Sequence, residues 1–186
     1  MKRFAAVILL LAALSGCAKI EESLDRAMAL RAKMLGSGGC TFDAMITADY
    51  GDTICAFLLS CKADAQGELT FTVKEPESIA GITGRICAEG GKLTFDDKAL
   101  AFELLADGQV APVTGPWIFL KTLQGGNIRS CAKDGERLLV SIDDSFEDDP
   151  LRLDIWLDEH DMPAACEIYY KNRRILTIEV RNFEIL

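Results

Sequence analysis

Apolar and polar residues alternate along most of this chain, and this alternation constrains the fold more than any other feature. From Cys40 onward the apolar residues recur at every second position, as in 67–74 and 151–158. A period of two places alternate side chains on one face of a β-strand. Short turn signals such as Tyr50-Gly51-Asp52 and Asp134-Gly135 separate the runs. The sequence therefore predicts about eleven strands in an antiparallel meander.

Two segments do not alternate, and both predict helices. Residues 19–35 repeat apolar residues at helical spacing, with acidic residues early and basic residues late, and end at Gly36. An apolar run after Pro112 predicts a short helix from about Pro116 to Gly125-Gly126. A long twisted sheet tends to curl, and its concave side needs apolar cover. We expect a mainly β (α+β) fold, either closed as a barrel or packed on a helix.

The first residues have the layout of a secretory signal. Lys2 and Arg3 precede eleven apolar residues, Phe4–Leu14, which as a helix cover about 16 Å, half of a ~30 Å bilayer core. The sequence that follows, LSGC at 14–17, resembles the bacterial lipobox. This resemblance implies a lipoprotein signal peptide at 1–16, cut before Cys17, with fatty acyl chains such as palmitate on Cys17. The alternative is an ordinary secretory signal with an incidental cysteine.

The mature chain, 17–186, is long enough for one well-cored domain. The chain has 20 basic and 29 acidic residues, and removal of Lys2 and Arg3 changes its formal charge from −9 to −11. Such a surface repels phosphate backbones, so we expect no nucleic-acid partner. It also repels anionic lipids, so membrane association depends on the anchor. We predict an extracytoplasmic monomer tethered to the cell membrane, or to the outer membrane in a cell that has one.

The mature chain has six cysteines besides Cys17, and their redox state stays open. An even number in an exported chain allows up to three disulfides, whereas free buried thiols behave as small apolar residues. If the first hairpin turns on Tyr50-Gly51, Cys40 faces Cys61 across the two strands, and we predict that disulfide. The other two pairs follow by elimination alone: Cys55 with Cys87, and Cys131 with Cys166.

Signals for metal binding and catalysis are weak. The acidic segments Asp143–Asp149 and Asp158–Asp161 lack the EF-hand spacing, and no C-x-x-C accompanies the single histidine, His160. A serine or cysteine nucleophile needs a nearby base, usually histidine. The chain also lacks the common phosphate-, dinucleotide- and serine-hydrolase motifs. We therefore expect no metal, no cofactor and no enzymatic activity.

Several stretches of the mature chain share a layout with a known family. They are Gly67–Pro76 (GELTFTVKEP), Ser78–Gly81, Lys92–Asp97, the Pro-flanked Trp117–Leu123 and a final hairpin from Met162 to Phe183. With the amino-terminal helix, this layout resembles the half-barrel lipoprotein carriers related to LolA and LolB. The resemblance implies a strongly curved antiparallel sheet of about eleven strands, with an amino-terminal and a short central helix on its concave face. The six cysteines depart from the typical carrier, and a soluble carrier would lack Cys17.

The resemblance also implies an apolar cavity between sheet and helices for a lipid or a lipoprotein acyl chain. The side chains that we place on its walls are large and apolar: Phe71, Phe102, Leu104, Trp117, Phe119, Leu120, Ile155, Leu157 and Ile168. Large apolar residues at strand spacing also form filled cores. The alternative is therefore a non-catalytic envelope protein whose packed sheet serves as a platform for a partner.

Overall fold

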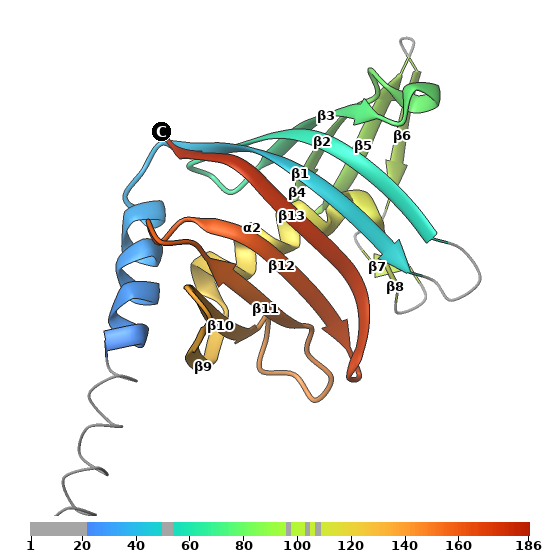
Figure 1. The fold of residues 1–186 in the computed structure, drawn as a ribbon. Coiled ribbons are helices and arrows are strands. Elements are labelled where there is room, and N and C mark those ends of the chain that lie inside the picture. Colours follow the sequence, from blue (N-terminus) through green and yellow to red (C-terminus); the bar gives the residue numbers. More distant parts are fainter. Residues whose placement is uncertain (1–21, 50–53, 96–97, 103–104, 107–108) are drawn as a thin grey trace, which may run out of the picture.

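The computed structural model describes residues 22–49, 54–95, 98–102, 105–106 and 109–186 (Figure 1). The predicted signal peptide and Cys17 lie outside this part. A helix, α1, runs through 22–35, and α2 covers Gly115–Gly125. Two short 3₁₀ helices are Glu77–Ile79 and Pro112–Thr114. The strands, in chain order, are β1 (Gly39–Asp49), β2 (Ile54–Asp64), β3 (Leu69–Glu75), β4 (Thr83–Cys87), β5 (Gly90–Phe95), β6 (Lys98–Phe102), β7 (Leu105–Ala106), β8 (Gln109–Val110), β9 (Asn127–Asp134), β10 (Arg137–Asp143), β11 (Arg152–Leu157), β12 (Pro163–Tyr170) and β13 (Arg173–Ile185).

Eleven of these strands form one antiparallel sheet in the order β6-β5-β4-β3-β2-β1-β13-β12-β11-β10-β9. The prediction of a mainly β, strongly curved antiparallel sheet with helices is confirmed. The first and last strands pair at the centre, so two meanders meet there, and β6 and β9 are the outer edges. Strands β7 and β8 pair with each other in a separate two-stranded sheet.

The central helix crosses the concave face because of this strand order. The chain leaves the sheet at β6, one edge, and re-enters it at β9, the other edge. Helix α2 makes this crossing and covers the central strands (Figure 1). It has Pro116 in its first turn, where the missing N–H costs nothing, and Gly126 follows its last residue as the C-cap. The predicted bounds of this helix are confirmed to within one residue.

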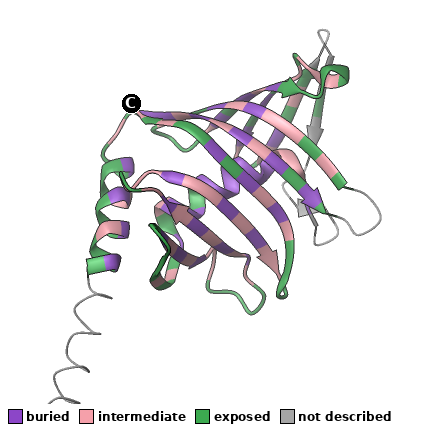
Figure 2. Cartoon of the chain, in the orientation of Figure 1, coloured by how far each residue is buried: buried purple, intermediate pink, exposed green. Residues whose placement is uncertain are grey.

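Alternate residues of the strands turn toward the two helices and are buried, as the bands in Figure 2 show. In β1 the inward residues are Phe42, Ala44, Ile46 and Ala48, all buried, with less buried residues between them. Burying one large aliphatic side chain contributes about 1.5–3 kcal/mol. The core therefore lies between the concave face of the sheet and the helices.

Arginine side chains of α1 hold this helix against the rest of the domain. Arg31 donates from Nε to the Leu123 carbonyl at 2.8 Å and from Nη2 to the Gly126 carbonyl at 3.0 Å. These carbonyls lie at the C-terminal end of α2, where backbone oxygens lack helical partners and carry partial negative charge. Arg26 donates from Nε to Oδ1 of Asp161 at 2.7 Å. The contacts fix α1 beside the end of α2 and the β11–β12 turn.

The ring of Phe71 occupies the space where Gly84 has no side chain. A Cβ built on Gly84 would lie 2.2 Å from Cζ of Phe71, which is too close without movement of the ring. We expect Gly84→Ala to lower the free energy of unfolding by about 1–3 kcal/mol, as overpacking does. Urea denaturation measures this, with Thr83→Ala on the opposite face of β4 as the control. Adding Phe71→Leu should recover part of the loss, and a fully stable Gly84→Ala protein would contradict the packing.

The register of the first hairpin differs from the predicted one. Cys40 lies opposite Ala63 and Cys61 lies opposite Phe42, so the two cysteines do not face each other. Both are free thiols in this structure, as are the other cysteines of the described part: Cys55, Cys87, Cys131 and Cys166. The residues that set the turn, 50–53, lie outside the described part. The predicted register is wrong, and the argument for a Cys40–Cys61 disulfide is lost with it.

The pair Cys131 and Cys166 has no support from the topology either. Cys131 lies in β9 and Cys166 in β12, with β10 and β11 between them. Neighbouring strands are about 4.8 Å apart, so three strand spacings exceed the reach of a disulfide.

Candidate functional site

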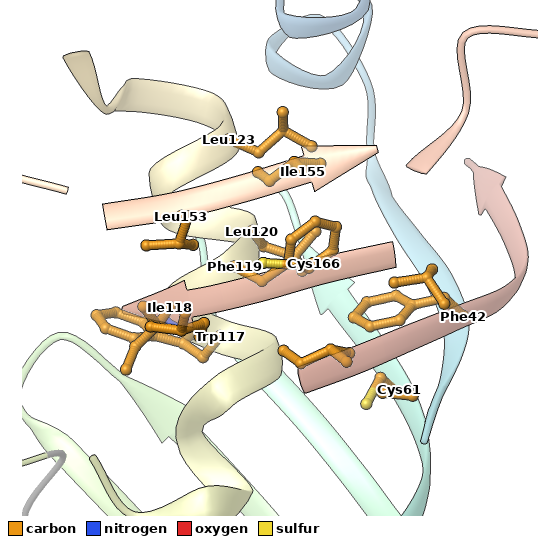
Figure 3. Packing of buried hydrophobic residues seen from close by; sticks show 14 of the residues in the cluster. Phe42, Cys61, Trp117, Ile118, Phe119, Leu120, Leu123, Leu153, Ile155 and Cys166 are labelled. Carbon is orange, nitrogen blue, oxygen red and sulfur yellow. The ribbon is translucent and has the colours of Figure 1, made fainter. Parts of the chain in front are cut away.

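The predicted ligand-binding residues that the structure describes belong to one buried cluster on the concave face. They are Phe71, Trp117, Phe119, Leu120, Ile155, Leu157 and Ile168. Phe119 is 0% exposed, and its ring meets that of Phe42 edge-on at 6.0 Å between centroids. Figure 3 shows Phe119 between α2 and the strands, near Cys166. The side chain of Phe102 and all of Leu104 lie outside the described part.

A cleft opens where α2 passes two turns of the sheet. Its volume is about 420 Å³, which falls within the usual range of about 300–1,000 Å³ for small-molecule sites. Trp117 and Leu120 from α2 line it, opposite Ala63 and Leu69 from the β2–β3 hairpin. Of the predicted site residues, Trp117 and Leu120 therefore reach this cleft, whereas the other five described ones line the core beyond it.

The rim of the cleft is charged, in contrast to its apolar wall. Lys121 and Arg85 are its cations, and Arg85 forms an ion pair with Glu68. The Lys121 ammonium lies 4.9 Å from the centroid of the Trp117 ring. The Trp117 indole N–H donates to the Gly67 carbonyl at 2.9 Å and so fixes the ring against the β2–β3 turn. The cleft thus combines an anchored aromatic wall with a polar entrance, which suits an amphipathic molecule.

The sequence interpretation missed most of the cleft residues because they lie in or next to turns, or on the more exposed side of a helix. The polar and small ones come from the β2–β3 hairpin, from β4 and the β4–β5 turn, and from α2: Asp64, Gln66, Gly67, Glu68, Arg85, Cys87, Ala88, Glu89, Lys121 and Gln124. The two turns are predictable from Asp64–Gly67 and Gly90-Gly91. Their meeting beside α2 depends on the path of that helix, which the alternation does not reveal.

A larger hollow of about 720 Å³ lies over strands β1–β5 and β13, and its chemistry is different. Its lining is dominated by outward-facing polar side chains, among them Thr41, Ser60, Thr70 and Thr83. These alternate with the buried residues of the same strands, so they belong to the polar face of the sheet. This hollow lacks the apolar wall that an acyl chain requires, and we therefore place the candidate site at the smaller cleft.

The cysteine thiols of the core are poor nucleophiles. Burial raises the pKa of Cys40 to about 11, and it also raises the pKa of Cys61 and that of Cys166 above their usual range. His160 is exposed in the β11–β12 turn. Among residues 22–49, 54–95 and 109–186, no three His, Cys, Asp or Glu side chains are grouped as a metal site. In the same part of the chain, no helix has both the length and the apolar character needed to cross a bilayer.

These pKa values predict the reactivity of the thiols. A thiol with a pKa near 11 is ionised in only about one molecule in a thousand at pH 8, and the thiolate is the reactive form. We expect iodoacetamide to modify Cys40, Cys61 and Cys166 in the folded protein far more slowly than the half-buried Cys87. Peptide mass mapping before and after denaturation measures this. Equal labelling rates for Cys166 and Cys87 in the native protein would contradict the burial.

Comparison with known proteins gives structural neighbours only. No family model and no curated protein matches this chain. Similar solved structures include a domain provisionally assigned to outer membrane lipoprotein sorting from Vibrio parahaemolyticus, with 11% identity, coverage of 89% of this chain and 93% of that one, and a TM-score of 0.48. A LolA superfamily protein from Nitrosomonas europaea has 9% identity, coverages of 86% and 93%, and a TM-score of 0.43. A DUF1329 family protein from Desulfovibrio piger has 8% identity, coverages of 89% and 92%, and a TM-score of 0.47.

At sequence identities of 8–11%, the similarity to these structures concerns only the arrangement of the sheet and helices, and it assigns no ligand. The fold and the cleft define a class of protein: a curved antiparallel sheet with two helices against its concave face and an amphipathic cleft beside the central helix.

Proposed function

We propose that this chain is an extracytoplasmic lipoprotein, anchored through Cys17, that binds a lipid or the acyl part of another lipoprotein in the cleft beside α2. The observation that carries the proposal is the division of the cleft into an apolar wall, formed by Trp117 and Leu120, and a charged rim. Ligand sites are mostly apolar with a few polar groups that fix orientation. The protein works as a non-catalytic binding module and as a monomer.

Each part of the cleft has a role in this proposal. The Trp117 ring, held by its bond to the Gly67 carbonyl, gives a rigid surface for an acyl segment. Lys121 is the rim cation on α2, and it lies beside that ring. An anionic or polar head group would lie at the rim near Lys121, with the chain directed toward Leu120.

Filling the cleft tests the proposal without disturbing the core. Ala88 is exposed and lines the cleft, so Ala88→Trp should obstruct it while the fold remains stable. We expect binding of a dansyl-labelled fatty acid, followed by fluorescence titration, to weaken at least about tenfold, or 1.4 kcal/mol. Ala132→Trp is the matched control, since Ala132 is exposed on β9 at the far edge of the sheet. Unchanged binding by Ala88→Trp, or no binding by the original protein, would refute the cleft as the site.

A second function is favoured by the packing of the interior. Phe119, Ile155, Leu157 and Ile168 are completely buried, as in a filled core. In this alternative the sheet is a rigid platform for an envelope partner. Cross-linking in cells separates the two functions: a specific protein partner, together with a purified protein that binds no lipid probe, would favour the platform.

A further inference from the structure

Helix α1 has two apolar faces, and one of them is exposed. Ala27, Leu30 and Met34 are buried in the core, as expected for a helix packed on a sheet. In the neighbouring sector of the helix surface, Leu24, Met28 and Leu35 are 41%, 46% and 64% exposed. We call these three residues the α1 stripe.

Helical geometry shows that the α1 stripe is a continuous surface. At 3.6 residues per turn, its three side chains lie within about 40° of one another around the helix axis. Arg31 lies between this sector and the buried one. Its guanidinium donates hydrogen bonds to backbone carbonyls at the end of α2. The charged residues Glu22, Asp25 and Lys33 occupy the remaining sector. An ordinary surface helix would have polar residues where the stripe lies.

The position of the stripe in the chain indicates what covers it. Only residues 18–21 separate Cys17 from the start of the described helix at Glu22. At no more than about 3.6 Å per residue, an anchor at Cys17 lies within about 18 Å of the first turn of α1. A membrane that holds the acyl chains is therefore within reach of the whole stripe if the helix lies along the bilayer surface.

The carboxyl terminus adds an exposed apolar side chain near the last turn of α1. Leu186 is 56% exposed, and its backbone is held beside the end of the helix. The Gly38 N–H donates to the Leu186 carbonyl at 3.1 Å, and the Leu186 N–H donates to the Gly39 carbonyl at 2.9 Å. Leu35 and Leu186 thus lie at the same end of the molecule.

We propose that the α1 stripe rests on the lipid surface in which Cys17 is anchored and orients the domain there. This inference rests on the proposed acylation of Cys17. The contact is apolar, since the formal charge of −11 for residues 17–186 disfavours attraction to anionic head groups. Three partly exposed side chains bind a membrane weakly on their own, but the anchor supplies a high effective concentration.

Quenching by brominated lipid tests the orientation directly. Met28→Trp places an indole in the stripe, and Ala29→Trp places one about 100° away on an exposed position of the same helix. Both lipidated proteins, expressed from the full chain, are reconstituted in phosphatidylcholine vesicles with and without brominated acyl chains. The native Trp117 and Trp156 also fluoresce, so the emission of the parent protein is measured under the same conditions and subtracted. We expect the added indole of Met28→Trp to be quenched at least about twofold more than that of Ala29→Trp, because interfacial helices bury one face by about 5–10 Å.

The possible outcomes separate this inference from the proposed anchor. Equal quenching of the two indoles, or quenching of neither, overturns the inference about the stripe. If fatty-acid labelling of Cys17 is still observed in that case, the proposed anchor is unaffected. A dimer in analytical ultracentrifugation with an unquenched Met28→Trp would assign the stripe to a second copy and also overturns it. If the Cys17→Ser variant binds vesicles as well as the parent protein does, this result contradicts the proposed acyl anchor, but it does not contradict the membrane contact of the α1 stripe. Equal melting temperatures of all variants show that the fold is intact.

Discussion

Replacement of Phe119 by alanine should lower the free energy of unfolding by about 3–5 kcal/mol, the usual cost of removing a buried aromatic ring. Phe119 is 0% exposed and lies where α2 meets the central strands, with the Phe42 ring 6.0 Å away. Its removal leaves a cavity that the sheet and helix close only in part. For a domain of this size, the melting temperature should fall by roughly 6–20 °C.

Chemical denaturation, followed by circular dichroism, measures this loss. Phe146→Ala is the matched control, because the Phe146 side chain is 89% exposed in the loop before β11 and its removal should change stability by no more than about 0.5 kcal/mol. Similar losses for the two variants would show that α2 is not packed on the sheet as described. A large loss for Phe119→Ala alone supports a filled core beneath the helix.

The alternation predicted which face each strand buries, but not which strands are neighbours. Phe71, Ile155 and Ile168 are all inward and buried, as their spacing indicated. The pairing of β1 with β13 joins the two ends of the domain, and no local pattern encodes it. Sequence-adjacent strands pair readily, so a simple meander was the natural prediction. The central position of β1 and β13, and hence the path of α2, depends on contacts across the whole chain.

The predicted register of the first hairpin was wrong for a related reason. The predicted and observed registers of the first hairpin differ by two residues, since Cys40 lies opposite Ala63 in place of Cys61. A shift of two preserves which side chains face inward, because the side-chain period of a strand is also two. Burial could therefore be predicted correctly while the partner of Cys40 was not. The turn residues decide between such registers, and their chemistry at 50–53 was not specific.

The candidate site was predictable only on its apolar side. Trp117 and Leu120 were identified because large apolar residues of a covering helix must meet the sheet. Ala88 and Glu68 carry no such signal, because small and charged residues in turns usually face solvent, and Lys121 is a charged residue on the exposed side of α2. They become site residues only because α2 passes beside the two turns.

The lipid anchor gives the second large expected effect. We expect Cys17→Ser to move nearly all of the protein from the membrane fraction to the soluble fraction of the envelope. Each acyl CH₂ contributes about 0.8 kcal/mol of membrane binding, and two or more chains anchor a protein stably where one does not. Carbonate washing of membranes, with incorporation of an alkyne-labelled palmitate, measures retention and acylation in the same cells.

The loss of Cys17→Ser from the membrane fraction should be large because the other contacts of the domain with the membrane are weak. The 29 acidic residues of the chain oppose its attraction to anionic lipids, and the α1 stripe offers three partly exposed side chains. Neither replaces the tens of methylene groups that two acyl chains bury. Cys55→Ser, which removes a thiol within β2, should remain in the membrane fraction at the level of the parent protein. Retention of Cys17→Ser at that same level would show that the domain is held by something other than an acyl anchor, and the LSGC at 14–17 would then be an ordinary cleavage site.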